Sequence, residues 1–146
     1  MGDPQDRFAQ MVTRLKQQGH RITPQRLAIL RILSVSQGHP SAEMIYDQIK
    51  KEFPYTSFAT VYKTISLAKA LGEVLELEFS QDSNRYDGNR PFPHPHLICT
   101  RCKTIMDPDL DAVNYLQDEI VKETGFEVTN HRLDFFGICP NCQKST

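Results

Sequence analysis

Two Cys-x-x-Cys motifs constrain the fold of this chain more than any other feature. One motif runs from Cys99 to Cys102 and the other from Cys139 to Cys142, and the sequence has no further cysteine. Two such motifs can place four thiolates at tetrahedral positions about zinc, at about 2.3 Å from the ion. Because four protein ligands leave no open position for a substrate, we predict a structural zinc whose binding contributes to folding. The alternative is four free buried thiols, and the paired spacing argues against it.

A proline-rich stretch with two histidines leads into the first motif. His94 and His96 lie one residue apart, and prolines occupy positions 91, 93 and 95. Since proline fixes φ and lacks an amide donor, this stretch should be neither a helix nor a central strand. We therefore predict a semi-rigid hinge at residues 91–95 that carries metal ligands, with Asp87 as a further candidate ligand.

The composition is ordinary for a globular protein, with 39% hydrophobic and 24% charged residues. No apolar run approaches the roughly 20 residues of a membrane span, and the polar N-terminus is unlike a secretory signal. We expect a cytoplasmic protein, in which paired cysteines bind metal rather than form disulfides. The net charge of −1 argues against a broad basic coat but leaves room for one local DNA-binding face. Basic residues outnumber acidic ones only in the first 92 residues, so any anion-binding half is the N-terminal one.

Helical periodicity and capping signals predict four helices in the first half of the chain, with Thr23 and Ser57 as caps and Ser41 at the start of the third helix. They run from Phe8 to Gly19, from Pro24 to Leu33, from Ser41 to Phe53 and from Ser57 to Gly72. The last two, joined by a short turn, follow the helix-turn-helix pattern. That pattern also occurs in proteins that never bind DNA, so on its own it leaves DNA binding open.

Two strands are predicted after the helices. Residues 73–79 nearly alternate apolar and charged side chains, as a strand would, and Arg85–Asp87 begins a partner strand. Helices followed by a hairpin make a winged helix. We therefore predict an α+β protein whose residues 1–90 form a winged-helix DNA-binding domain.

Residues 96–146 are predicted to form a small α/β domain. The expected elements are strands at His96–Cys99 and Lys103–Asp107, a helix capped by Asp109 and ending at Gly125, and a longer strand at Phe126–Gly137. A sheet with one helix offers too small a core to be stable alone. A structural metal and dimerisation through the sheet edge or the helix face would supply the missing stability.

Taken together, these motifs resemble the ferric uptake regulator (Fur) family over nearly the whole chain. They are Arg21–Arg26 (RITPQR), His39–Tyr46 (HPSAEMIY), Ala59–Tyr62 (ATVY), Arg85–Asp87 (RYD), His94–Cys102 (HxHxICxxC), and His131–Leu133 with Gly137–Cys142 (HRL…GICxxC). The resemblance implies a homodimer with a winged-helix domain and a small α/β dimerisation domain. It also implies that double-stranded operator DNA is the partner and that the helix around residues 59–69 is the recognition helix.

The resemblance, carried over position by position, implies two metal sites and a DNA-binding face. The four cysteines would hold structural Zn(II), and a regulatory Fe(II) or Mn(II) would take His39, Asp87, His94, His96 and Asp107. Three imidazoles and two carboxylates suit these ions better than tetrahedral zinc. Spacing alone supports only His94 and His96, with Asp87 as a candidate. The DNA-binding residues implied are Arg21, Tyr55, Ser57, Ala59, Thr60, Tyr62 and Lys63.

Within the family, Asp87 and Asp107 distinguish the type. Ferric uptake regulators usually have Glu at both positions, whereas peroxide-stress regulators of the PerR type have Asp. A further family site is degraded, because prolines replace two of its ligands and only His131 remains. At Lys63 the chain departs from the Asn of peroxide regulators, which leaves the operator sequence open.

The resemblance thus implies a metal-dependent transcriptional repressor that senses hydrogen peroxide and then releases DNA. Iron-catalysed oxidation of a ligand histidine, His39 or His94, would be the trigger, a single-use reaction rather than enzymatic turnover. An iron- or zinc-responsive repressor of the same family is the alternative. A zinc hydrolase or deaminase is disfavoured because no Glu stands at the His-x-Glu position. A protein-interaction domain stabilised by zinc would explain the cysteines without any DNA binding.

Overall fold

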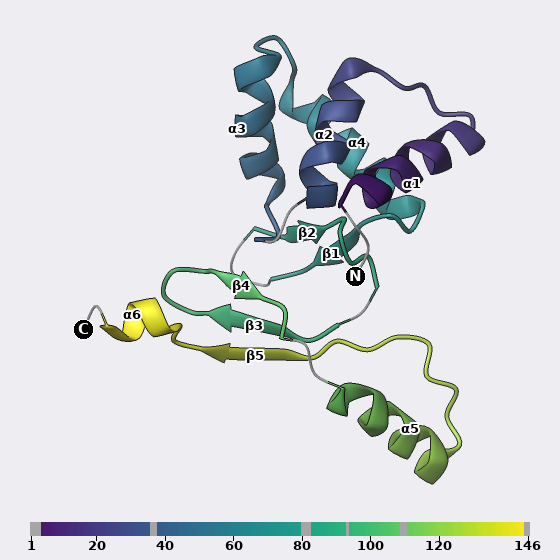
Figure 1. The fold of residues 1–146 in the computed structure, drawn as a ribbon, viewed down its shortest axis with the longest axis vertical. Helices are drawn as coiled ribbons and strands as arrows, with labels where there is room; N and C mark the ends of the chain where they lie inside the picture. The colour runs from purple at the N-terminus through teal and green to yellow at the C-terminus, as the bar shows by residue number, and fades with distance from the viewer. Residues whose placement is uncertain (1–3, 36–37, 80–82, 93, 109–110, 145–146) are drawn as a thin grey trace. The chain divides into compact units, whose positions relative to one another are not determined.

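The computed structural model describes residues 4–35, 38–79, 83–92, 94–108 and 111–144. The chain divides into two compact units, Met1–Phe92 and Pro93–Thr146 (Figure 1). Pro93 of the predicted hinge and Asp109, the predicted cap of the C-terminal helix, lie outside the described residues. Within the described parts of the chain, no helix combines the length and apolarity needed to cross a bilayer.

The N-terminal unit contains the four predicted helices. They are α1 (Pro4–Gln17), α2 (Pro24–Val35), α3 (Ala42–Glu52) and α4 (Phe58–Ala70). The predicted caps are confirmed, since the hydroxyls of Thr23, Ser41 and Ser57 each accept a hydrogen bond from the backbone N–H three residues on, at 3.1–3.2 Å. Such a cap satisfies one of the amides that a helix leaves unpaired at its start.

Apolar side chains from all four helices form one core. Its fully buried members include Met11, Leu15, Ile29, Leu30, Leu33, Ile45, Val61, Ile65 and Ala68. Each large one stabilises the unit by about 1.5–3 kcal/mol relative to an exposed side chain. Because α4 buries Val61, Ile65 and Ala68, its opposite face is left to the solvent.

A two-stranded antiparallel hairpin, β1 (Leu75–Leu77) and β2 (Arg85–Asp87), follows the helices (Figure 1). Strand β1 is shorter than the predicted strand at 73–79. The Tyr86 amide donates to the Pro40 carbonyl at 3.0 Å, so β2 is hydrogen-bonded to the segment that enters α3. The predicted helices and hairpin are therefore both present.

Arg7 fastens α1 to the hairpin. Its Nε donates to the Gly88 carbonyl at 2.9 Å, and its Nη2 contacts Glu73 Oε2 at 2.9 Å. Gly88 itself packs against α2, because a Cβ there would lie 2.8 Å from the Leu33 carbonyl oxygen. Only glycine fits at such a close backbone approach, and the end of β2 is held in place as a result.

The C-terminal unit contains a three-stranded sheet in the order β4-β3-β5. Its elements are β3 (His96–Cys99), β4 (Ile105–Met106), α5 (Ala112–Thr124), β5 (Asp134–Gly137) and α6 (Pro140–Lys144). Strand β3 pairs antiparallel with β4 and parallel with β5. The helix ends at Gly125 in the left-handed conformation, φ 73°, as predicted.

The predicted strand at Phe126–Gly137 is wrong for most of its length. Only residues 134–137 are a strand, because their partner β3 spans just four residues and pairs with all four of them. Residues 126–133 have no strand structure. Partial apolar alternation was therefore not enough to make a strand where the neighbouring strand had ended.

Helix α5 buries none of its side chains within this chain. Tyr115, Leu116 and Ile120 are 73%, 50% and 45% exposed. Leu116 and Ile120 follow helical spacing in the sequence, and the single chain does not bury them. An apolar face of this kind on a short helix is typical of a surface that another molecule covers.

Candidate functional site

The four cysteines form one compact cluster in the C-terminal unit. Their sulfur atoms all lie within 4.8 Å of one another. The Sγ–Sγ distances are 3.8 Å for Cys99 to Cys142 and 3.7 Å for Cys102 to Cys139. Sulfurs at about 2.3 Å from a tetrahedral zinc would be about 3.8 Å apart, so the cluster has the dimensions of a zinc site.

The surroundings of the cluster favour a thiolate at Cys99. Backbone N–H groups of Cys102 and Cys139 donate to its sulfur at 3.5 and 3.4 Å. These donors lower the pKa of Cys99 to about 5. Hydrogen bonding to the Cys139 thiol, together with burial, raises the pKa of Cys142 to about 12. A divalent cation is what allows sulfurs this close together to be deprotonated at once.

A second cluster in the C-terminal unit contains His94, His96 and Asp107. Both histidines are buried, and one ligand atom from each of the three residues lies within 4.8 Å of the others. His94 Nε2 is 3.1 Å from one Asp107 oxygen, and His96 Nε2 is 3.7 Å from the other. Imidazole nitrogens that converge on a carboxylate are ligands suited to Fe(II) or Mn(II).

The pairing of β3 with β4 explains how Asp107 reaches the two histidines. Leu97 pairs with Met106 across the antiparallel strands, so Asp107 comes next to His96. Sequence spacing gave no reason to join Asp107 to the histidines, and only the family resemblance did. A confident hairpin register would have been the signal that found it.

Sequence reasoning missed Asp134. Strand β5 places it opposite His96 in the parallel pair, and its Oδ1 lies 3.5 Å from His96 Nδ1. Arg132 Nε donates to the other Asp134 oxygen at 2.6 Å. A carboxylate on one ring nitrogen fixes which nitrogen a histidine presents on its other side. Asp134 therefore lies on the Nδ1 side of His96, and Asp107 lies on its Nε2 side.

His39 and Asp87 form a pair in the N-terminal unit. His39 Nδ1 lies 3.5 Å from Asp87 Oδ2, and both side chains are 1% exposed. The other carboxylate oxygen accepts hydrogen bonds from the amides of Asn89 and Arg90, each at 2.9 Å. These bonds turn Oδ2 toward the histidine. The five predicted ligands of the regulatory metal are thus brought together as two sets, one within each unit.

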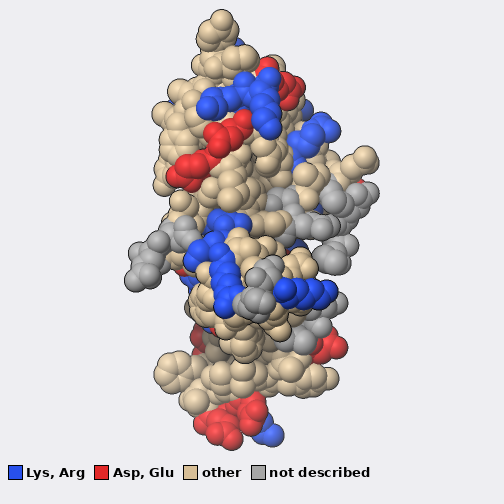
Figure 2. All heavy atoms as spheres, turned by 90° about the vertical axis from the view of Figure 1, so that its left-hand side faces the viewer, with Lys and Arg blue, Asp and Glu red and all other residues tan. Residues whose placement is uncertain are grey.

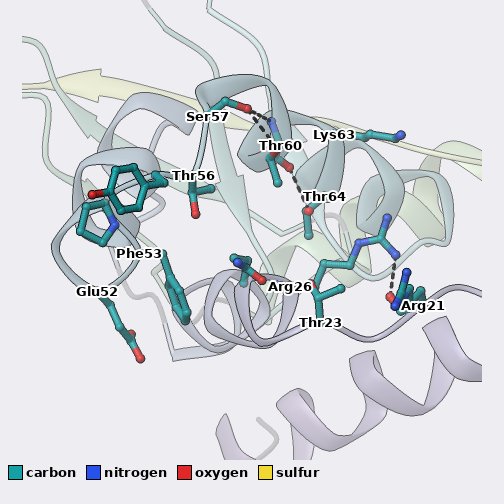
Figure 3. A pocket seen from close by; sticks show the side chains of 13 residues that line it. Arg21, Thr23, Arg26, Glu52, Phe53, Thr56, Ser57, Thr60, Lys63 and Thr64 are labelled. Atoms are coloured by element: carbon teal, nitrogen blue, oxygen red, sulfur yellow. Dashed lines mark hydrogen bonds between the residues drawn. The ribbon is translucent and has the colours of Figure 1, made fainter.

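Five of the seven predicted DNA-binding residues line a hollow of about 630 Å³ in the N-terminal unit (Figure 3). Arg21, Tyr55, Ser57, Thr60 and Lys63 line it, and Tyr62 and Ala59 lie on exposed turns of α4 outside it. Figure 3 shows the α4 hydroxyl side chains along one side of the hollow, opposite the start of α2. Ser57, the cap at the start of α4, also lines the hollow, and a helix N-terminus attracts phosphate.

The hollow carries a small local excess of positive charge. Arg21, Arg26 and Lys63 line it together with a single acidic residue, Glu52. The face drawn in Figure 2 carries both basic and acidic side chains. This agrees with the near-neutral net charge of −1, and it suits contacts through one face rather than a general affinity for polyanions.

Comparison with known proteins places the chain in a family. The model of the Ferric uptake regulator family matches residues 17–136. The peroxide-responsive repressor PerR of Staphylococcus aureus (strain USA300) is 40% identical over 132 residues, which cover 90% of this chain and 88% of that protein. Its sequence thus aligns with both units of this chain.

Two solved structures are similar over nearly their whole length. The ferric uptake regulator Fur of Helicobacter pylori has a TM-score of 0.82 at 25% identity and covers 97% of this chain and 95% of its own. PerR from Streptococcus pyogenes has a TM-score of 0.52 at 34% identity and covers 93% of this chain and 92% of its own.

These likenesses confirm the predicted α+β fold, a winged helix followed by a small α/β domain. The cysteine cluster fits a structural zinc, and the histidine and aspartate residues fit a regulatory metal. The chain therefore belongs to the ferric uptake regulator family and is a metal-responsive regulator.

Proposed function

We propose that this protein is a DNA-binding transcriptional repressor that senses hydrogen peroxide through bound iron. The observation that carries the proposal is the choice of carboxylates, since aspartate stands at both positions, Asp87 and Asp107, beside buried histidines. In the family that pair of residues is typical of peroxide regulators, whereas iron regulators usually have glutamate. The similarity to PerR of Staphylococcus aureus supports the same reading.

We propose that five residues together hold one Fe(II) or Mn(II) ion. His39 and Asp87 come from the N-terminal unit, and His94, His96 and Asp107 come from the C-terminal unit. The support is chemical, because each set is assembled and largely buried within its own unit, and the combined donors suit these ions. Ligation from both units would fix their relative pose, and metal loss would release it.

The two units then have separate tasks in DNA binding. We propose that the hollow and the exposed face of α4 contact operator DNA through Arg21, Tyr55, Ser57, Ala59, Thr60, Tyr62 and Lys63. The exposed apolar face of α5 and the edge strand β5 support a homodimer formed by the C-terminal unit. A dimer would place two α4 helices in successive major grooves, about 34–36 Å apart. Typical coupling between such metal and DNA sites is about 1–3 kcal/mol.

Peroxide would open this arrangement through the ligand histidines. An Fe(II) ion held by these residues would activate hydrogen peroxide, so that one peroxide oxygen is added to a histidine ring carbon and the other leaves as water. The ring would be the net electron donor, and the iron would return to Fe(II). We assign that ring to His39 or His94. An oxidised imidazole is a poorer ligand, so the residue that carries it no longer holds the two units together, and DNA affinity falls.

Asp107→Glu tests the proposal. The longer carboxylate should keep metal-dependent DNA binding and blunt the response to peroxide. Mass spectrometry of the iron-loaded wild-type protein should show one added oxygen on the peptide with His39 or His94, and the manganese-loaded protein should show none. Equal peroxide sensitivity of Asp107→Glu and wild type would contradict the assigned role of Asp107. Metal-dependent DNA binding that peroxide never alters would identify an iron- or zinc-responsive repressor instead.

A further inference from the structure

His39 has a backbone conformation that few residues of its kind adopt. Its φ is 50°, in the left-handed region, and the only other described non-glycine residue with positive φ is Lys103. The side chain is also 1% exposed. A non-glycine residue keeps such a conformation only where its surroundings hold it there, and such sites cluster at functional positions.

Arg85 of β2 provides the contacts that hold this backbone. Its Nε donates to the carbonyl of His39 itself, and its Nη2 donates to the carbonyl of Gly38 at 3.0 Å. A guanidinium presents these two donors in one rigid plane. Two successive carbonyls therefore have to point toward Arg85 together, which fixes the rotation of the peptide between them.

Asp87, two residues along the same strand, contacts the imidazole ring. Side chains at positions i and i+2 of a strand lie on the same face, so Arg85 and Asp87 reach His39 from one side of β2. The strand is itself fixed by the bond from Tyr86 N to the Pro40 carbonyl and by the bridge between Ser41 and Arg85. Strand β2 thus contacts His39 twice, at its main chain through Arg85 and at its ring through Asp87.

We propose that Arg85 is a positioning residue for the regulatory metal, acting through His39. It sets the backbone of residues 38 and 39 so that the imidazole is presented in the geometry in which it binds. The inference rests on the proposed function in one respect, namely that His39 is a ligand. Arg85 contacts His39 at its backbone carbonyl rather than at its ring, so its removal should weaken metal binding through His39.

The test is a double-mutant cycle on the full-length, zinc-loaded protein, with Mn(II) affinity as the first readout. We expect Arg85→Ala to weaken Mn(II) binding by roughly 10- to 100-fold, as loss of a ligand's supporting contact does. The double variant His39→Ala with Arg85→Ala should bind no more weakly than His39→Ala alone. Arg85→Lys keeps the charge but not the planar fork, so its affinity should lie nearer to that of Arg85→Ala than to wild type.

A second readout needs no regulatory metal. Backbone NMR shifts of residues 38–41 should move in Arg85→Ala, while those of the helical core stay in place. Arg14→Ala removes an exposed arginine of α1 and is the matched control, expected to change neither readout. The zinc content of each variant reports that the C-terminal unit is intact.

The outcomes separate the two hypotheses. If His39→Ala weakens Mn(II) binding and Arg85→Ala does not, the role of Arg85 is overturned and the proposed function stands. Additive losses in the double variant would also overturn it, because they would mean that Arg85 acts independently of His39. If His39→Ala binds Mn(II) as wild type does, the ligand assignment in the proposed function fails, and the role of Arg85 fails with it.

Discussion

The two units of this chain are stabilised in different ways. In the N-terminal unit, apolar residues from four helices and the hairpin are buried in one core. In the C-terminal unit, the buried apolar residues among those described are Ile98, Cys99 and Ile105, and α5 buries none. The first unit carries its own core, whereas the second buries too few apolar side chains to be stable without further support.

The largest expected effect is loss of the zinc cluster. Cys102→Ser removes one of four ligands, and structural zinc sites contribute about 10–16 kcal/mol of binding free energy to folding. We expect hydrogen exchange to show an unfolded C-terminal unit and a protected N-terminal unit. Chelation of the wild-type protein should reproduce this pattern. A variant that keeps β3 and β5 protected without zinc would show that the unit has a sufficient core of its own.

The second prediction changes the N-terminal unit instead, by opening a cavity in its helical core. Ile65 is fully buried in α4, and Ile→Ala at such positions costs about 2–5 kcal/mol. Ile65→Ala should lower the unfolding midpoint of the N-terminal unit and leave the zinc content unchanged. Ser66→Ala, on the exposed side of the same helix, is the control. Loss of zinc from Ile65→Ala would mean that the two units do not fold independently.

The exposed face of α5 tests the role of the partner. Leu116→Glu places a charge on that face, and a substitution at the centre of an interface typically costs about 2 kcal/mol or more. We expect the dimer dissociation constant, measured by sedimentation equilibrium, to rise by at least about 30-fold. Lys122→Glu, in the last turn of the same helix, should change it little. An unchanged dimer in Leu116→Glu would assign the interface to another surface.

The smallest expected effect concerns a polar network in the wing. Glu76 accepts hydrogen bonds from Lys69, from Asn84 at 3.1 Å and from Tyr86 at 2.9 Å. Burial alone would raise the pKa of Glu76, but these three donors together lower it. A lowered pKa in the folded state stabilises that state above the unfolded pKa, and the stabilisation is lost as pH falls through the folded value.

Glu76→Gln should therefore destabilise the N-terminal unit by about 1 kcal/mol near neutral pH. The difference from wild type should begin to shrink below the ordinary glutamate pKa of about 4.3 and disappear once the pH falls below the lowered folded pKa. Glu78→Gln makes the same charge change at an exposed position of the same hairpin and is the control. Denaturant unfolding at several pH values measures both. A difference that persists unchanged into acid would show that the carboxylate charge is not what Glu76 contributes.

Local signals made the N-terminal unit predictable. The hydroxyls at Thr23, Ser41 and Ser57 cap the helices they were expected to cap. The prediction of a strand over residues 126–137 was wrong because the length of β5 is set by its pairing with β3, which is distant in the sequence. Asp107 and Asp134 join His96 through strand register, and a single sequence without a known register does not contain that pairing.

The backbone of His39 could not be read from the sequence either. Nothing around Gly38 and Pro40 indicates a left-handed histidine, and the contact that holds it comes from Arg85, far along the chain. The candidate ligands could be named from motifs and resemblance. Ligand geometry required the structure, because it is set by residues on other elements.

Operator binding with defined metals is the most direct test of the account. Zinc-loaded protein would be titrated onto operator DNA by fluorescence anisotropy with Fe(II), with Mn(II) and without either, before and after peroxide. We expect tight binding with both metals, weak binding without them, and loss of binding after peroxide only in the iron form. Tight binding without either metal, or equal loss in the manganese form, would contradict it.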